Sequence, residues 1–225
     1  MQPIRLLGIH SSPIKDGNCA YLLDYALNKA VQQEGVVADK ATLGGLKISD
    51  CVQCNWCMKK QTADRLCNVE DDALPILHQI DVCDILILMT PVYFARLSGA
   101  MACLLDRTRC FLFGKEKRQS LKGKIGIAMA VGWMRNGGIE TTLESVHSAF
   151  LLHEMWTPSV HEAGTVFGIG AVSGPLHADQ PFKRDRLGVK EDGQALRATD
   201  LFVKKAVETA RMLRRKNADA ADMIP

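Results

Sequence analysis

Short, almost continuous apolar runs punctuate this chain of 225 residues. Three of them are strong and two are weaker, and they cover residues 4–10, 84–92 and 124–132, then 36–43 and 165–172. Runs of this length and composition predict β-strands, and strands that are apolar throughout are typical of a parallel sheet buried on both faces. The 36–43 run is more polar, so we expect it near an edge of the sheet.

Between these runs, apolar residues recur at intervals of three and four, which is helical spacing. The predicted helices cover residues 18–34, 98–113, 137–155 and 194–216. Strands that alternate with helices predict an α/β fold with an open, doubly wound sheet. A ligand of such a sheet is expected beyond the carboxyl ends of its strands.

Composition and charge narrow the class of protein. Hydrophobic residues make up 47% of the chain, charged residues make up 24%, and the formal net charge is +3. These values are ordinary for a globular enzyme and indicate no nucleic-acid or membrane-surface partner. The first residues do not resemble a signal peptide, and no apolar run reaches the roughly 18 residues that would span a bilayer. We therefore expect a cytoplasmic protein with reduced thiols.

The first strong strand runs into the loop SSPIKDGNC, residues 11–19, which opens the next predicted helix. Hydroxyl groups, a lysine and backbone N–H groups at a helix N-terminus suit a phosphate. The loop matches neither the dinucleotide glycine fingerprint nor the nucleotide-triphosphate loop, so it suits a terminal monophosphate. Such residues also form ordinary turns and caps, so the loop alone leaves both interpretations open.

The other two strong strands also end in unusual loops. The sequence TPVYFA at 90–95 places two aromatic residues after a strand-ending proline, where they suit a flat ring or the edge of the core. The sequence GWMRNGG at 132–138 allows either a close backbone approach to a ligand or a tight turn. A phosphate loop, an aromatic loop and a glycine loop at one sheet edge together predict a flavin mononucleotide (FMN) pocket.

Four of the eight cysteines fall within residues 50–67, at Cys51, Cys54, Cys57 and Cys67. The first three have the two-residue spacing of iron–sulfur proteins, and Cys67 would provide the fourth ligand of a [4Fe–4S] cluster. Zinc also accepts four thiolates. A third interpretation is that these cysteines bind no metal and are small hydrophobic residues. We interpret Cys83, Cys103 and Cys110 as core residues.

These segments resemble the NADPH-dependent FMN reductase-like branch of the flavodoxin-like superfamily. SSPIKDGNC resembles its GSPRxxGNT loop, TPVYFARLSGAMACLLDR resembles SPVYFGxLSGxLKxxxDR, and GWMRNGGIETTL resembles GGxRxGGQETTL. The cysteine segment falls where iron-sulfur flavoproteins of this branch carry theirs. The resemblance covers most of residues 4–150 and implies a flavodoxin-like, five-stranded parallel sheet in the order 2-1-3-4-5. It also implies a single domain over 1–225, with a cysteine-bearing insertion at 47–72 and an irregular loop region at 164–193.

The resemblance further implies which residues bind the cofactors. It assigns the FMN phosphate to Ser12, Lys15, Gly17, Asn18 and Cys19, and the isoalloxazine ring to Pro91, Val92, Tyr93, Phe94, Ala95 and Gly132. The [4Fe–4S] ligands are then Cys51, Cys54, Cys57 and Cys67. No catalytic side chain is expected, because the chemistry takes place on FMN. This chain departs from the family pattern at Ile14, Cys19 and Ala95, and in the long gap before Cys67.

The function that the resemblance implies is an FMN-dependent oxidoreductase with a [4Fe–4S] cluster. It would pass electrons from a donor such as ferredoxin through FMN to a small oxidant, in a homodimer or homotetramer. Three alternatives stay open: a clusterless NAD(P)H-dependent FMN or quinone reductase, a flavodoxin-like electron carrier without catalysis, and a zinc-stabilised flavin-binding module.

Overall fold

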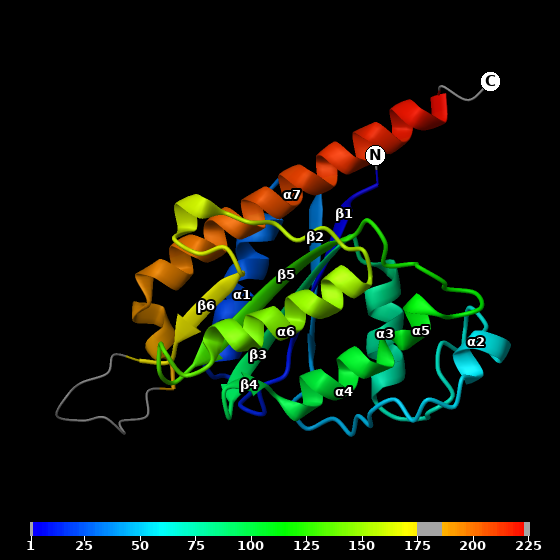
Figure 1. Cartoon of the computed structure of the whole chain (residues 1–225). Helices are drawn as coiled ribbons and strands as arrows, with labels where there is room; N and C mark the ends of the chain where they lie inside the picture. Colours follow the sequence, from blue (N-terminus) through cyan, green and yellow to red (C-terminus); the bar gives the residue numbers. More distant parts are fainter. Residues whose placement is uncertain (1, 175–185, 223–225) are drawn as a thin grey trace.

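A central parallel sheet organises the computed structural model, which describes residues 2–174 and 186–222 (Figure 1). Its parallel strands are β1 (Ile4–His10), β2 (Val36–Thr42), β3 (Ile85–Tyr93), β5 (Ile125–Gly132) and β6 (Ile169–Val172). They lie in the order β2-β1-β3-β5-β6. Counted along the chain, this is the predicted order 2-1-3-4-5, so the flavodoxin-like topology is confirmed. The two-residue strand β4 (Arg96–Leu97) pairs antiparallel with the end of β3 and was not predicted.

The two most apolar strands lie at the centre of the sheet. Every residue of β5 is buried, as are the first seven residues of β3. The strands pair in parallel from Ile85 opposite Ile125 to Pro91 opposite Val131. Central strands meet side chains on both faces, which explains why their sequences are apolar without alternation. The more polar β2 forms an edge, as predicted.

Helices cover both faces of the sheet (Figure 1). On one face lie α1 (Asn18–Val31) and α7 (Gly193–Asp222), and on the other lie α3 (Ala73–Val82), α4 (Gly99–Arg107) and α6 (Ile139–Leu152). Shorter elements are α2 (Trp56–Lys60), α5 (Arg109–Leu112) and the 3-10 turns η1 (His161–Ala163) and η2 (Gly188–Glu191). Within the described ranges 2–174 and 186–222, no helix combines the length and apolarity needed to span a bilayer.

Several elements differ from the sequence prediction. The helix expected over 98–113 is divided at Thr108 into α4 and α5, and the Thr108 hydroxyl donates to the Leu105 carbonyl at 2.6 Å. Such side-chain bonding competes with helix continuation. Strand β6 begins only at Ile169, because Gly168 has φ +113° and lies against the Ala128 carbonyl. Helices α2 and α3 were not predicted, and α7 is longer than expected.

Gly126, in the central strand β5, provides a test of the packing. A Cβ at this position would lie 2.6–2.8 Å from ring atoms of Phe150, which is itself buried. We expect Gly126→Ala to lower the free energy of unfolding by about 1–3 kcal/mol, because overpacking strains a dense core. Urea denaturation measures this change. Gly99→Ala is the matched control, since a Cβ there would meet nothing within 4 Å. Equal stabilities of the two variants would contradict this packing.

Candidate functional site

The loops that follow β1, β3 and β5 meet at the carboxyl edge of the sheet. The backbone N–H of Ser11 donates to the Met89 carbonyl at 3.0 Å, and the Ser98 hydroxyl donates to Ser11 Oγ at 2.7 Å. A Cβ on Gly138 would lie 2.3 Å from the Cα of Ala95, so the glycine loop packs directly on the aromatic loop. The three loops therefore form one continuous surface at the position where doubly wound sheets bind ligands.

The first of these loops leads into the N-terminus of α1. Gly17 is the N-cap residue, and among the described residues no side-chain cap bond is made at this N-cap position. Lys15 is exposed, and the buried Ser12 hydroxyl accepts a hydrogen bond from the Ile14 N–H at 3.2 Å. Burial raises the pKa of Cys19 to about 12, so its thiol carries no charge that would repel an anion. An uncapped helix N-terminus beside a lysine suits a phosphate group.

Asn18, the remaining residue assigned to the phosphate, has a structural contact as well. Its side-chain oxygen accepts a hydrogen bond from the Val189 N–H at 2.9 Å. This bond connects the start of α1 to η2 across 171 residues of sequence. Asn18 thus fixes the position of the loop.

The second loop is a tight hairpin, which corrects the sequence interpretation. Strand β3 does not end at the proline but continues to Tyr93, and the chain returns as β4. The two turn residues, Phe94 and Ala95, have φ values of 49° and 58°. Left-handed geometry at both positions is that of a type I′ turn, which normally takes Asn and Gly. The turn leaves Phe94 fully exposed, so this ring does not cap the core.

The third loop begins at Gly132, which the family resemblance assigns to the isoalloxazine ring. Gly132 is buried, and a Cβ there would lie 2.9 Å from Cγ1 of Ile139. Its missing side chain therefore makes room for Ile139. The residue that contacts another loop is Gly138, whose φ of +99° favours glycine.

Large apolar side chains gather on these loops. Five of them are at least two-fifths exposed: Ile14, Tyr93, Phe94, Trp133 and Met134. Contiguous exposed apolar groups are uncommon on soluble proteins and mark ligand or partner sites. Beside an anion site, this surface fits a ligand with a flat ring and a phosphate.

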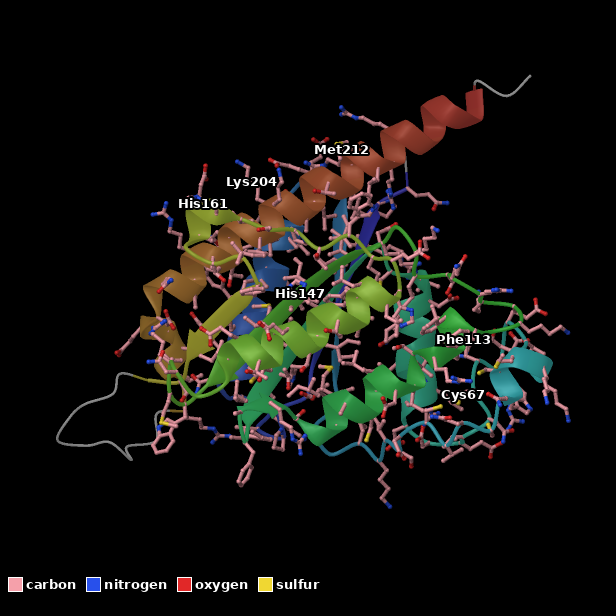
Figure 2. The ribbon with its side chains drawn as sticks, in the orientation of Figure 1. Cys67, Phe113, His147, His161, Lys204 and Met212 are labelled. Carbon is pink, nitrogen blue, oxygen red and sulfur yellow. The ribbon has the colours of Figure 1, made fainter. Side chains whose placement is uncertain are left out.

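A second site lies at the end of the molecule formed by α2, α3 and α5, where Figure 2 labels Cys67. A cavity there contains about 340 Å³ of empty space that includes open solvent. It is lined by Cys51, Val52, Cys54, Asn55, Cys57, Cys67, Asn68, Val69, Arg107, Arg109 and Cys110. All four predicted ligands therefore face one space. Cys83 and Cys110 are buried in the core as predicted, although Cys110 also faces this space, while Cys103 is only partly buried.

The spacing of these thiols bears on the kind of metal site. Across residues 2–174 and 186–222, no three Cys, His, Asp or Glu side chains are placed to hold one metal ion. Zinc needs all of its sulfur ligands at about 2.3 Å from a single ion. A [4Fe–4S] cluster gives each thiolate its own iron and so spreads the sulfurs around a larger body. Convergent but separated cysteines fit the cluster better than zinc.

Hydrogen bonds close the base of the cysteine segment. The Lys47 N–H donates to Asp72 Oδ2 at 2.7 Å, and the Ser49 N–H donates to Asp71 Oδ2 at 2.9 Å. From α4, Arg107 donates to the same Asp71 oxygen at 2.6 Å and to the Ser49 carbonyl at 3.2 Å. It also donates to the Val69 carbonyl at 3.0 Å. One buried guanidinium thus holds both ends of the segment together.

Gln61 connects the cysteine segment to α5 and the turn after it through hydrogen bonds of its side chain. Its buried side-chain nitrogen donates to the carbonyls of Leu66 and Cys110 at 3.0 and 2.9 Å. Its oxygen accepts from the N–H groups of Glu116 and Lys117 at 3.1 and 2.9 Å. With both donors and its acceptor used, Gln61 fixes α2 against α5.

The two charged side chains that line the cavity, Arg107 and Arg109, are both positive. Burial opposes the charged form of Arg107, but the hydrogen bond to Asp71 and the neighbouring Cys67 raise its pKa. Burial and the neighbouring Cys67 raise the pKa of Cys57, while the charge of Arg109 acts in the opposite direction. A metal that binds these thiols must therefore displace their protons.

Sequence reasoning missed Arg107, Gln61 and Cys110. One signal was available for Arg107, because it follows the buried Met101 and Leu104 at intervals of three along α4. A charged residue on the apolar face of a helix requires a buried partner. No comparable local signal identified Gln61 or Cys110, because their partners come from distant segments.

The sheet order and the three loops define a flavodoxin-like protein with a flavin-type ligand surface. A family model described as NADPH-dependent FMN reductase matches residues 4–167. The chain belongs to this family and is a flavin-dependent oxidoreductase.

Two curated relatives cover most of this chain to different extents. An iron-sulfur flavoprotein of Methanocaldococcus jannaschii is 32% identical over 98% of this chain and 99% of its own length. An iron-sulfur flavoprotein of Methanosarcina thermophila is 30% identical over 68% of this chain and 75% of its own length. The iron–sulfur property is named in these relatives, so the role of the cysteine segment in this chain is a matter for proposal.

Solved structures share the fold at low sequence identity. RosB with bound 8-demethyl-8-formylriboflavin-5'-phosphate gives a TM-score of 0.72, with 17% identity over 97% of this chain and 86% of that one. A WrbA-like flavodoxin of Agrobacterium tumefaciens gives a TM-score of 0.58, with 13% identity over 93% of this chain and 98% of that one. These likenesses support the flavodoxin-like fold.

His10, at the end of β1, makes stability depend on pH. Burial, followed by the charge of Lys40, lowers its pKa from 6.5 to about 4. The unfolded chain takes up a proton near pH 6.5 and the folded chain only near pH 4. Stability is therefore lost as pH falls through this window, by roughly 3 kcal/mol. Urea denaturation at pH 7 and pH 4.5 should show a smaller loss for His10→Gln than for the wild type. An identical loss would contradict the burial of a neutral imidazole.

Proposed function

We propose that this protein binds FMN and a [4Fe–4S] cluster and passes electrons from a donor such as ferredoxin through FMN to a small oxidant. The observation that carries the proposal is the convergence of Cys51, Cys54, Cys57 and Cys67 on one cavity. The names of the iron-sulfur flavoprotein relatives support the same conclusion.

Two sets of residues are assigned to FMN. Its phosphate is held by Ser12, Lys15, Gly17, Asn18 and Cys19, and its ring is bordered by Pro91, Val92, Tyr93, Phe94, Ala95 and Gly132. Bound FMN supplies a centre that exchanges electrons either singly or in pairs. The backbone N–H groups at the start of α1 bind the phosphate, while the rigid hairpin orients the ring and excludes water from one side of it.

The cysteines are the cluster ligands in this proposal. They belong to a segment, residues 47–72, that we regard as an insertion into a single flavodoxin-like domain spanning 1–225. A clusterless reductase would have no need to gather four thiols around one space, and none of them has a disulfide partner among the described residues. We also propose a homodimer or homotetramer.

A second candidate function is NAD(P)H-dependent reduction of FMN or a quinone. The description of the matching family model favours it, because that family is named for NADPH. The two candidates differ in the donor: rapid bleaching of the flavin by NADPH alone supports the reductase. Bleaching only with reduced ferredoxin supports the first proposal.

Lys15 tests the phosphate site. We expect Lys15→Gln to weaken FMN binding roughly fivefold and to leave riboflavin binding unchanged, because riboflavin lacks the phosphate. Equilibrium titration of the flavin-free protein, followed by flavin fluorescence, gives both dissociation constants. Lys122→Gln is the control, because Lys122 lies in the turn before β5, at the amino edge of the sheet and away from the phosphate loop. Its side chain pairs with Glu154. Equal weakening of FMN and riboflavin by Lys15→Gln would contradict the assignment.

Cys57 tests the cluster site. We expect Cys57→Ser, purified without oxygen, to lose most of the iron that the wild type carries, while retaining FMN. Cys103→Ser is the control, because Cys103 lies on α4 and does not line the cavity. Iron and acid-labile sulfide analysis measures the difference. Equal iron contents in the two variants would contradict the role of Cys57 as a ligand.

A further inference from the structure

The charged side chains that line the cysteine cavity are all positive, although Asp71 pairs with Arg107 behind it. The described lining of the cavity contains two arginines, Arg107 and Arg109, and no aspartate, glutamate or lysine. A cluster held by four thiolates is a net anion, so the lining complements its charge. Both arginines belong to the α4–α5 segment, which lies outside the cysteine segment that supplies the ligands.

Hydrogen bonds already fix most of the two guanidinium groups. Arg107 uses its terminal nitrogens on Ser49, Val69 and Asp71. Arg109 donates to the side-chain oxygen of Asn55 at 2.6 Å and lies 5.0 Å from the centre of the Phe113 ring. Asn55 stands between Cys54 and Cys57, so Arg109 contacts the loop that carries two of the ligands.

One donor on each arginine has no such contact. Within the described residues, the Nε atoms of Arg107 and Arg109 are buried and have no hydrogen-bond partner. An unpaired buried donor is costly unless a ligand completes it. Since both residues line the cavity, we infer that an acceptor in that space is the missing partner of these donors. Sulfur atoms of an iron–sulfur cluster are such acceptors.

We propose that Arg107 and Arg109 act on the cluster itself, donating N–H hydrogen bonds to its sulfur atoms and raising its reduction potential. This inference rests on the proposed cluster. Reduction adds one electron to the cluster, which makes it more negative, and nearby cations stabilise the more negative state more than the oxidised one. The electron comes from an external low-potential donor, for which dithionite serves in the test.

The two arginines have separable roles. Arg107 also closes the base of the cysteine segment, so its removal leaves Asp71 buried without its cation and endangers folding. Arg109 is partly exposed and pairs with no carboxylate among the described residues, so its removal leaves the fold intact. The effect of Arg109 on the cluster potential is therefore measurable without loss of the protein.

The test compares Arg109→Gln with Arg65→Gln in protein that holds its cluster. Arg65 is the control, an arginine of the cysteine segment that pairs with Glu70 and does not line the cavity. A dithionite titration at fixed pH, followed by electron paramagnetic resonance, gives the cluster midpoint potential. In Arg109→Gln we expect the ratio of reduced to oxidised cluster at a given potential to fall roughly three- to tenfold, where tenfold corresponds to 59 mV for one electron.

The outcomes separate this inference from the proposed function. Wild-type protein without iron overturns the proposed cluster. Iron-loaded protein whose potential is the same in the wild type and Arg109→Gln, or equally shifted in Arg65→Gln, overturns only the role of Arg109. If Arg109→Gln does not retain iron, Arg109→Lys carries the test, because lysine keeps the charge and loses the planar donor fork. A lowered potential in that variant supports the hydrogen bond, and an unchanged one overturns it.

Discussion

The buried guanidinium of Arg107 is the constraint on which the second site depends. Its side chain is inaccessible to solvent, and its partner Asp71 is 9% exposed. Burying a charge is expensive unless its hydrogen bonds are satisfied, and removing one partner of such a pair typically costs 3–5 kcal/mol. Here the partners lie at residues 49, 69 and 71, on both sides of the cysteines. The need to satisfy one cation therefore closes the segment into a loop and brings its thiols together.

The same helix reaches the flavin-type surface. At the start of α4, the Ser98 hydroxyl accepts from the Met101 N–H and donates to Ser11 in the loop after β1. At its end, Arg107 holds the cysteine segment. One rigid element of nine residues thus fixes both candidate sites relative to the sheet. This arrangement ties the proposed FMN site and the proposed cluster site to the same helix.

The features predicted from the sequence are those that depend on the pattern of neighbouring residues. Apolar runs identified the parallel strands, helical spacing identified α1, α6 and α7, and the three loops at the carboxyl edge follow from where parallel strands end. Sequence reasoning did not predict the hairpin at Phe94 and Ala95, because the left-handed turn carries neither Asn nor Gly. Nor did it predict that Cys110 faces the cysteine cavity, since that proximity depends on contacts such as the Gln61 bonds between segments 49 residues apart.

The central claim is that one chain carries both FMN and a four-iron cluster. The most direct measurement is an absorption spectrum of the wild-type protein, purified without oxygen, combined with analysis of flavin, iron and acid-labile sulfide. The account predicts one FMN and about four irons with four sulfides per chain, with a broad cluster shoulder beneath the flavin bands. Flavin bands without iron or sulfide would contradict it and would leave the cysteine cavity a structural feature of a simple flavin reductase.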